Sequence, residues 1–176
     1  MLVTLSGLPG SGTSTVARLL SAQLGIDHLD GGTAFRALAA ERGMSLADFA
    51  ALAERDDVID RALDERLTER ARAGEVLLES RLAGWLATRA GLPALRVWVA
   101  CDDLERARRV GARDGHDSEA ARRVNAEREA SERARYLRYY GIELADLSIY
   151  DAVLDSTRIG PDELVAAIID ALAACR

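Results

Sequence analysis

A short glycine-rich segment near the amino terminus constrains this chain more than any other part of its sequence. Residues 7–14 are Gly-Leu-Pro-Gly-Ser-Gly-Thr-Ser, and they follow the apolar run Leu2–Leu5. The order matches the phosphate-loop pattern G-x-x-x-x-G-K-[ST], except that Thr13 stands where the lysine belongs. The segment therefore predicts a buried strand, a tight turn and a helix, arranged to hold the phosphates of a nucleotide.

The residue types in this loop suit an anion site. Gly7, Gly10 and Gly12 can take backbone angles that a Cβ forbids, so that successive N–H groups line a concave surface. Ser14 supplies a hydroxyl that would coordinate Mg²⁺. The alternative is a strand-to-helix turn without a ligand, and Thr13 strengthens that alternative because the usual point charge is missing. No other lysine can replace it, since all 23 basic residues of the chain are arginine.

The bulk composition excludes several other classes of protein. The 176 residues suffice for one domain, and 49% apolar with 30% charged residues is ordinary for a soluble globular chain. The net charge of −6 argues against nucleic acid as a partner. Cys101 and Cys175 lack metal-ligand spacing and fit a reduced, cytoplasmic setting. No apolar run approaches the length that crosses a membrane, and the chain begins with a strand rather than a signal peptide.

Short apolar runs alternate with stretches of helical periodicity. The expected strands are Leu2–Leu5, Ile26–Leu29, Val76–Leu78, Leu95–Ala100 and Ala152–Leu154. This alternation predicts βαβ crossovers and a parallel sheet with helices on both faces. Ligands bind beyond the carboxyl ends of such strands. We therefore expect the chemistry in the segments 7–14, 30–36, 79–84 and 155–158. Two long helical stretches, 45–73 and 117–140, read as insertions at that edge.

Three side chains outside the loop follow strand ends and are candidates for the site. Arg36 lies one helical turn beyond Gly32, where a guanidinium can bind a phosphate, although a helix cap with a solvated arginine is the plainer interpretation. Glu79 ends a buried strand beside the loop and is placed to hold Mg²⁺, directly or through water. Arg81 is placed as a second phosphate clamp. The alternative for Glu79 and Arg81 is a buried ion pair with a structural role only.

Arginines crowd the second helical insertion. Arg128, Glu132 and Arg135 fall at i, i+4 and i+7, so one face of the helix carries all three. Movable arginines on a helical flap suit phosphoryl transfer, because positive charge must be spread over several oxygens and water excluded. The alternative is an exposed i,i+4 pair of little energetic value. His28 and His116 have no carboxylate or cysteine at a telling spacing, and we interpret them as a strand-end residue and a flap-turn residue.

Taken together, these segments resemble the nucleoside monophosphate kinases, most closely the short archaeal-type cytidylate kinases. The resemblance runs through nearly the whole chain. Its strongest marks are Gly-Leu-Pro-Gly-Ser-Gly at 7–12, Gly-Gly-Thr-Ala-Phe-Arg at 31–36, Leu-Glu-Ser-Arg-Leu-Ala-Gly-Trp at 78–85, Tyr-Tyr-Gly-Ile-Glu at 139–143 and Asp-Leu-Ser-Ile-Tyr-Asp at 146–151. Each mark is short, but their order and spacing make coincidence improbable.

The resemblance implies an α/β fold of the P-loop NTPase type. It would be a three-layer sandwich whose five-stranded parallel sheet has the order 2-3-1-4-5. A single domain, residues 1–176, would carry a helical insertion that binds the nucleoside monophosphate (about 33–74) and a lid (about 112–140). The implied reaction transfers the γ-phosphoryl of ATP to CMP or dCMP with Mg²⁺, giving ADP and the diphosphate. We expect a monomer.

The resemblance also assigns roles to individual residues. The expected catalytic residues are Arg81, Arg128, Arg135 and Thr13. Those expected to bind ATP are Gly7, Leu8, Pro9, Gly10, Ser11, Gly12, Thr13, Ser14, Thr15, Asp155 and Thr157, with Ser14 and Glu79 at the metal. Those expected to bind the acceptor are Gly31, Gly32, Arg36, Asp60, Arg61, Arg81, Arg128 and Glu132.

Two departures from the family pattern keep alternatives open. Thr13 replaces the lysine, and an arginine of the lid or Arg81 would have to supply the lost charge. Leu82 stands where larger bacterial relatives carry an aspartate that reads cytosine. The base would then be read elsewhere, with Asp57, Asp60, Arg61 and Asp64 as candidates. A different acceptor, such as UMP or a specialised metabolite, and a catalytically weak nucleotide-binding module are the alternative functions.

Overall fold

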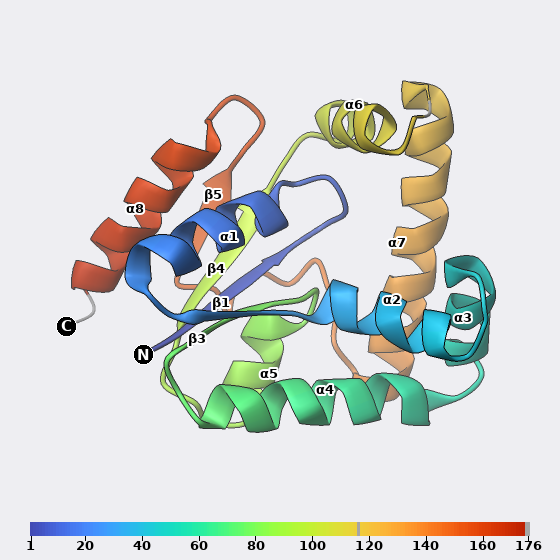
Figure 1. Cartoon of the computed structure of the whole chain (residues 1–176), viewed down its shortest axis with the longest axis horizontal. Coiled ribbons are helices and arrows are strands. Elements are labelled where there is room, and N and C mark those ends of the chain that lie inside the picture. The colour runs from blue at the N-terminus through green and yellow to red at the C-terminus, as the bar shows by residue number, and fades with distance from the viewer. Residues whose placement is uncertain (116, 175–176) are drawn as a thin grey trace.

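A five-stranded parallel sheet forms the centre of the molecule (Figure 1). The computed structural model describes residues 1–115 and 117–174, and over these residues the sheet has the order β2-β3-β1-β4-β5. The strands are β1 (Leu2–Gly7), β2 (Asp27–Asp30), β3 (Val76–Glu79), β4 (Leu95–Ala100) and β5 (Ala152–Asp155). The helices are α1 (Thr13–Leu24), α2 (Gly31–Glu41), α3 (Leu46–Ala53), α4 (Asp57–Arg72), α5 (Ala83–Arg89), α6 (Asp103–Asp114), α7 (Ser118–Tyr140) and α8 (Pro161–Ala174).

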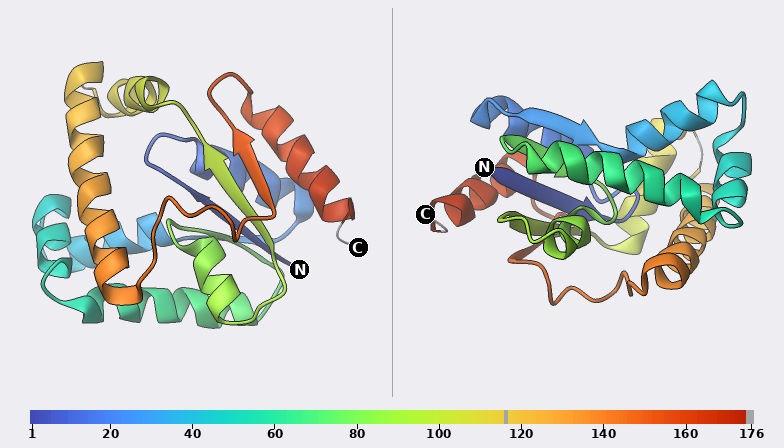
Figure 2. Two further views of the ribbon diagram at one scale, coloured as in Figure 1. Left: turned by 180° about the vertical axis from the view of Figure 1, so that it is seen from behind. Right: turned by 90° about the horizontal axis from the view of Figure 1, so that it is seen from below.

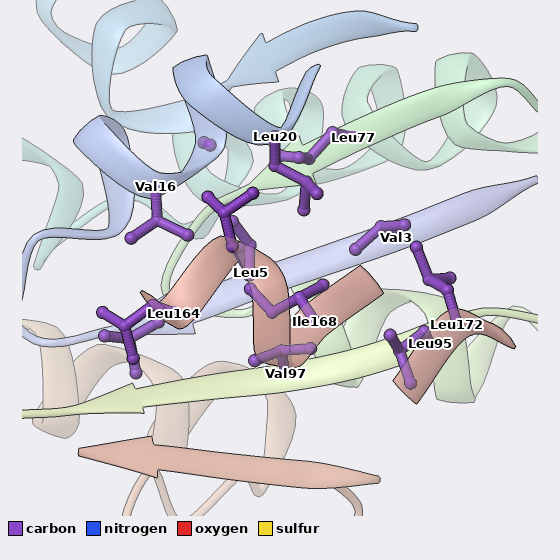
Figure 3. Close-up of a cluster of buried hydrophobic side chains, with 13 residues drawn as sticks. Val3, Leu5, Val16, Leu20, Leu77, Leu95, Val97, Leu164, Ile168 and Leu172 are labelled. Atoms are coloured by element: carbon purple, nitrogen blue, oxygen red, sulfur yellow. The ribbon is translucent and has the colours of Figure 1, made fainter. Parts of the chain in front are cut away.

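Helices cover both faces of the sheet, so the core has two halves. On one face, α1 and α8 pack on β1 and β4, where Val16, Leu20 and Ile168 interdigitate with Leu5 and Val97 (Figure 3). On the opposite face, α4 and α5 pack on β1 and β3 through a second apolar cluster. β1 and β3 are buried along their whole length, which explains why their sequences are continuous apolar runs rather than alternating ones. The expected three-layer sandwich with the order 2-3-1-4-5 is confirmed.

The remaining helices stand at the carboxyl ends of the strands. α2 and α3 follow β2, α6 follows β4, and α7 rises beside them at one end of the molecule (Figures 1 and 2). α6 and α7 pack closely on each other. Of the insertions expected at 45–73 and 117–140, α3 and α7 therefore lie at the edge where a parallel sheet binds its ligands, whereas α4 packs on a face of the sheet.

The predicted element boundaries differ from the structure by one or two residues. β2 begins at Asp27 rather than Ile26, and β3 runs one residue further, to Glu79. The first helix after β2 begins at Gly31, because the carboxylate of Asp30 accepts hydrogen bonds from the backbone N–H groups of Gly32 and Thr33. The last helix begins at Pro161, a residue that suits the first turn of a helix because its missing N–H has no intrahelical partner there. Across the described residues, no helix is both long and apolar enough to span a bilayer.

Candidate active site at the carboxyl edge of the sheet

The glycine-rich loop connects β1 to α1 and has the backbone form of an anion site. Gly10 and Gly12 have φ angles of +84° and +91°, a region that side chains other than glycine rarely adopt. Gly7 is different, because its φ is not positive. A Cβ on Gly7 would lie 2.5 Å from Ser11 Oγ and 2.8 Å from the carbonyl oxygen of Val99, so crowding requires glycine there. The expectation that all three glycines serve backbone angles is therefore wrong for Gly7.

The residue in the lysine position begins helix α1 and faces inward. Thr13 is buried, and its methyl group lies 2.8 Å from the position that a Cβ of Gly7 would occupy. Gly12, at the helix N-cap, has no side chain, so the N–H groups of the first turn of α1 receive no side-chain cap. The N–H of Thr15 donates to the carbonyl of Gly12 over 3.1 Å, and the positive end of the helix dipole lies at the loop.

A hydroxyl, a carboxylate and an imidazole meet beside the loop. Ser14 Oγ donates to Glu79 Oε1 over 2.6 Å, and Glu79 Oε2 lies 2.8 Å from Nε2 of His28. Parallel pairing brings these groups together, because β2 and β3 end side by side with Asp30 opposite Glu79. The carboxylate is buried, and its two oxygens are held in one orientation by residues from two other elements. His28 was missed in the sequence, because its partner lies 51 residues away.

Three guanidinium groups contact carbonyl oxygens of the loop. Arg81 Nη1 donates to the carbonyl of Gly7 over 2.9 Å, and Arg106 Nη1 donates to that of Pro9 over 3.1 Å. Arg109 lies 3.5 Å from the carbonyl of Ser11 and donates more strongly to the carbonyl of Ser156, over 2.7 Å. Arg81 was expected near the loop from the sequence, whereas Arg106 and Arg109 were not, since both lie in a helix with several other arginines.

Glu132 of α7 occupies the centre of a buried charge cluster. Arg81 Nε and Arg128 Nε each donate to it over 2.9 Å. Burial disfavours the charged carboxylate, but the guanidinium groups of Arg81 and Arg128 outweigh burial and hold the pKa of Glu132 below its usual range. The i,i+4 pair considered in the sequence exists, yet Glu132 is buried rather than solvated. Arg81 pairs with Glu132, and the alternative of a Glu79–Arg81 ion pair is not what forms.

Arg135, on the same helix, takes a different partner. Its Nε donates to Asp60 Oδ2 of α4 over 2.8 Å, and both side chains are buried. The guanidinium also lies over the ring of Phe35, 5.7 Å from the centroid. Arg128 and Arg81 therefore share Glu132, whereas Arg135 pairs with Asp60 of the helical insertion between β2 and β3.

Further contacts fix α4 against the carboxyl-terminal end of α7. Arg61 Nη2 donates to the carbonyl of Tyr139 over 2.9 Å, and the hydroxyl of Tyr140 donates to Asp64 Oδ2 over 2.7 Å. Burial raises the pKa of Asp64 to about 7, and burial also raises the pKa of Asp60 although Arg135 opposes it. Asp60, Asp64 and Arg61, which the sequence offered as base-reading candidates, are all engaged by α7 in this structure.

The residues after β2 that were expected to bind the acceptor lie in the first turns of helix α2. Arg36 is half exposed and donates to Thr33 Oγ1 over 2.8 Å, with Asp30 Oδ2 at 3.6 Å. A Cβ on Gly31 would lie 2.9 Å from Cβ of Ser80, so this glycine permits close packing of α2 on the end of β3. Arg36 and Arg81 are thus not joined by a direct contact, and the helix-cap interpretation of 30–36 describes the local structure.

A surface pocket of about 460 Å³ lies at the carboxyl ends of β4 and β5. It is lined by Ala100, Cys101, Asp102, Asp155, Thr157 and Arg158. Thr157 Oγ1 accepts from the backbone N–H of Asp102 over 2.9 Å and donates to Asp155 Oδ1 over 2.6 Å, which ties the two strand ends together. The pocket contains the two residues of this loop that were expected to bind ATP. His116 lies outside the described residues.

Comparisons with known proteins agree on one family. A family model described as an AAA domain matches residues 3–134. The cytidylate kinase of Halobacterium salinarum is 45% identical over 98% of this chain and 89% of its own length. The cytidylate kinase of Methanopyrus kandleri is 44% identical over 98% of this chain and 94% of its own. That of Pyrococcus abyssi is 42% identical over 96% and 91%.

Solved structures match at lower identity and establish the fold. An uncharacterized protein from Eubacterium ventriosum superimposes with a TM-score of 0.71 at 16% identity, over 98% of both chains. Shikimate kinase from Aquifex aeolicus gives a TM-score of 0.61 at 17% identity, over 98% of this chain and 96% of its own. The sheet order and these neighbours together define a P-loop kinase fold.

Proposed function

The chain belongs to the cytidylate kinase family, and from this membership we propose that it transfers the γ-phosphoryl group of ATP to CMP or dCMP, giving ADP and CDP or dCDP. The observation that carries the proposal is the similarity to archaeal cytidylate kinases at 40–45% identity over most of the chain. The geometry agrees with it, because a phosphate loop and a cluster of guanidinium groups share one edge of the sheet.

ATP would bind across the loop and the pocket beside β5. Backbone N–H groups of the glycine-rich loop and of the start of α1 would hold the β- and γ-phosphates. The pocket at Asp155 and Thr157 would take the adenine. Ser14 Oγ and Glu79 Oε1, 2.6 Å apart, are hard oxygen donors of the kind that Mg²⁺ prefers. When bound there, Mg²⁺ would neutralise charge on the phosphates.

The acceptor would bind between the insertion at about 33–74 and the lid at about 112–140. Arg81 lies between the loop and α7, and its contacts with Gly7 and Glu132 support a role at the junction of donor and acceptor phosphates. Arg128 shares Glu132 with it. Arg36 and Arg135 now hold Asp30 and Asp60, so both would exchange a carboxylate for a phosphate when the nucleotides bind.

No side chain needs to act as a general base in this reaction. The attacking oxygen of a nucleoside monophosphate is already anionic at neutral pH, so catalysis consists of positioning and charge neutralisation. Thr13 contributes backbone N–H and a hydroxyl, and the charge that a lysine would bring must come from arginine. We also propose that the protein works as a monomer in the cytoplasm, which its net charge of −6 and the absence of paired cysteine motifs support.

Release of ADP over a panel of nucleoside monophosphates tests this function. CMP and dCMP should give the highest kcat/KM, and UMP should be weaker. If UMP or a small metabolite outside the panel were preferred, the proposed acceptor would be wrong, but the proposed phosphoryl transfer from ATP would stand.

Binding of an oligophosphate that joins adenosine to cytidine separates a kinase from a nucleotide-binding module. A kinase with two adjacent sites should bind this bisubstrate analogue at least 100-fold more tightly than ATP. Equal affinity for the analogue and ATP would mean a single nucleotide site and would contradict the proposal.

A further inference from the structure

Two arginines connect the phosphate loop to the same helix. Arg81 joins the carbonyl of Gly7 to Glu132, and Arg106 joins the carbonyl of Pro9 to Glu129. The two glutamates are three residues apart in α7 and therefore lie on the same side of that helix. Each bridge thus runs from a loop carbonyl through a guanidinium to α7. The family resemblance gave Arg81 a role, but it gave none to Arg106 or Glu129.

Arg106 is the more deeply placed of the two bridges. Its side chain, at the start of α6, is only 6% exposed. Nη1 donates both to the Pro9 carbonyl and to Glu129 Oε1, while Nη2 lies 3.4 Å from Asp103 Oδ1. A buried arginine with a purely structural role is stabilised by ion pairs with carboxylates alone. Here the same nitrogen holds a backbone carbonyl of the phosphate loop as well.

The backbone of α6 also touches the loop at this point. A Cβ on Gly10 would lie 2.6 Å from the carbonyl oxygen of Arg106 and 3.0 Å from its Cα. The loop therefore rests on the first turns of α6 without space for a side chain. This close approach and the guanidinium bond are independent observations, and both show that α6 fixes the peptide between Pro9 and Gly10.

We propose that Arg106 is a positioning residue for the phosphates of ATP, and that Glu129 couples its orientation to helix α7. In a trans peptide the C=O and N–H groups point in opposite directions. When Arg106 holds the carbonyl of Pro9 towards α6, the N–H of Gly10 is turned to the other side, where the proposed phosphates bind. A charged donor on the carbonyl also polarises the peptide and strengthens that N–H as a donor.

Glu129 gives this arrangement its link to the proposed lid. It accepts from the nitrogen that holds Pro9, so the position of α7 determines how firmly the guanidinium is oriented. A substitution at Glu129, which lies on α7 and not on the loop, should therefore weaken ATP binding through Arg106. The inference rests on the proposed function, since it needs a chain that binds ATP.

The test compares ATP affinity, by calorimetry, in matched variants of the full chain. Arg106→Met and Glu129→Gln should each raise the dissociation constant for ATP about tenfold, the effect of losing one charge-assisted hydrogen bond. Arg106→Lys should fall between, because one ammonium cannot hold both partners in the geometry of a guanidinium. The controls are Arg108→Met and Glu119→Gln, which remove exposed charges from the same two helices and should leave affinity unchanged.

Coupling is tested with the double variant. If Glu129 acts through Arg106, the double variant should bind ATP no more weakly than Arg106→Met alone. Additive effects would contradict the coupling. A lowered melting temperature with unchanged ATP affinity in Glu129→Gln would contradict the positioning role, and this variant decides the question even if Arg106→Met does not fold. If the wild type itself fails to bind ATP, the proposed function fails instead.

Discussion

The buried carboxyl of Asp64 makes the stability of this protein depend on pH in a predictable direction. Asp64 accepts a hydrogen bond from the hydroxyl of Tyr140 over 2.7 Å, and burial raises its pKa from 3.8 to about 7. The folded protein therefore holds this proton more tightly than the unfolded chain does. Between about pH 4 and pH 7 the folded state binds more protons, so stability falls as pH rises through this window. The contribution is complete below about pH 4 and lost above about pH 7.

The size of the effect follows from the shift in pKa. Each pH unit inside the window changes the free energy of unfolding by about 1.4 kcal/mol, so the two units between pH 5 and pH 7 amount to about 3 kcal/mol. Asp64→Asn removes the titrating group but keeps an oxygen that can accept from Tyr140. We expect the stability of Asp64→Asn, relative to the wild type, to improve by about 3 kcal/mol between pH 5 and pH 8.

Urea unfolding at pH 5, 6, 7 and 8 measures this difference. Asp60, whose pKa is also raised by burial, is present in both proteins, so its contribution largely cancels. Asp170→Asn, on the exposed surface of α8, is the matched control and should show no such trend. If wild type and Asp64→Asn changed in parallel over the whole range, Asp64 would be ionised in the folded protein, and the reasoning from burial would be refuted.

Three further substitutions test other parts of the site. Thr13→Lys should tighten ATP binding about tenfold, through one charge-assisted hydrogen bond, and unchanged affinity by calorimetry would mean that the arginines already supply that charge. Gly10→Ala should lower the free energy of unfolding, measured in urea, by about 3 kcal/mol, because φ is +84° and a Cβ would collide with the backbone of Arg106. The control Gly43→Ala should lower it by only about 1 kcal/mol, because Gly43 has φ +64° but no atom lies near the added Cβ. Arg135→Met should destabilise by about 3 kcal/mol in the same assay, because Asp60 loses its buried partner, and adding Asp60→Leu should recover much of that loss. If the double variant were as unstable as Arg135→Met alone, the ion-pair explanation would be contradicted.

The sheet could be predicted because its signal is local. β1 and β3 are covered on both faces, so their apolar runs allowed both strands to be predicted. The glycine-rich loop predicted that a helix follows β1. Parallel pairing then placed every strand end at one edge, which is why the positions after β1, β2 and β3 were sound candidates. The first residue of α2 was less predictable, because Gly31 and Gly32 are poor helix formers, whereas the carboxylate of Asp30 caps the helix that begins there.

The partners of the charged side chains could not be predicted from the sequence. His28 and Glu79 meet through the pairing of two strands, and Arg106 meets Pro9 across 97 residues. One helix face carries Arg128, Glu132 and Arg135, but Arg135 pairs with Asp60 of α4, while Glu132 is bound by Arg81 and Arg128. Spacing along a helix defines a shared face, whereas the choice among several opposite charges depends on tertiary packing.

Because Thr13 stands in the place of the lysine, this loop must be arranged to bind a phosphate in another way. A lysine brings a mobile charge into the site itself. Here Arg81 and Arg106 hold the carbonyls of Gly7 and Pro9, and both are paired with glutamates of α7. While they stay paired with glutamates, these guanidiniums add little net charge to the loop, and their effect in this state is on the orientation of the peptide N–H groups. A loop whose peptides are oriented by arginines bound to α7 depends on that helix in a way that a loop with its own lysine does not. Phosphate affinity should therefore depend on the position of α7.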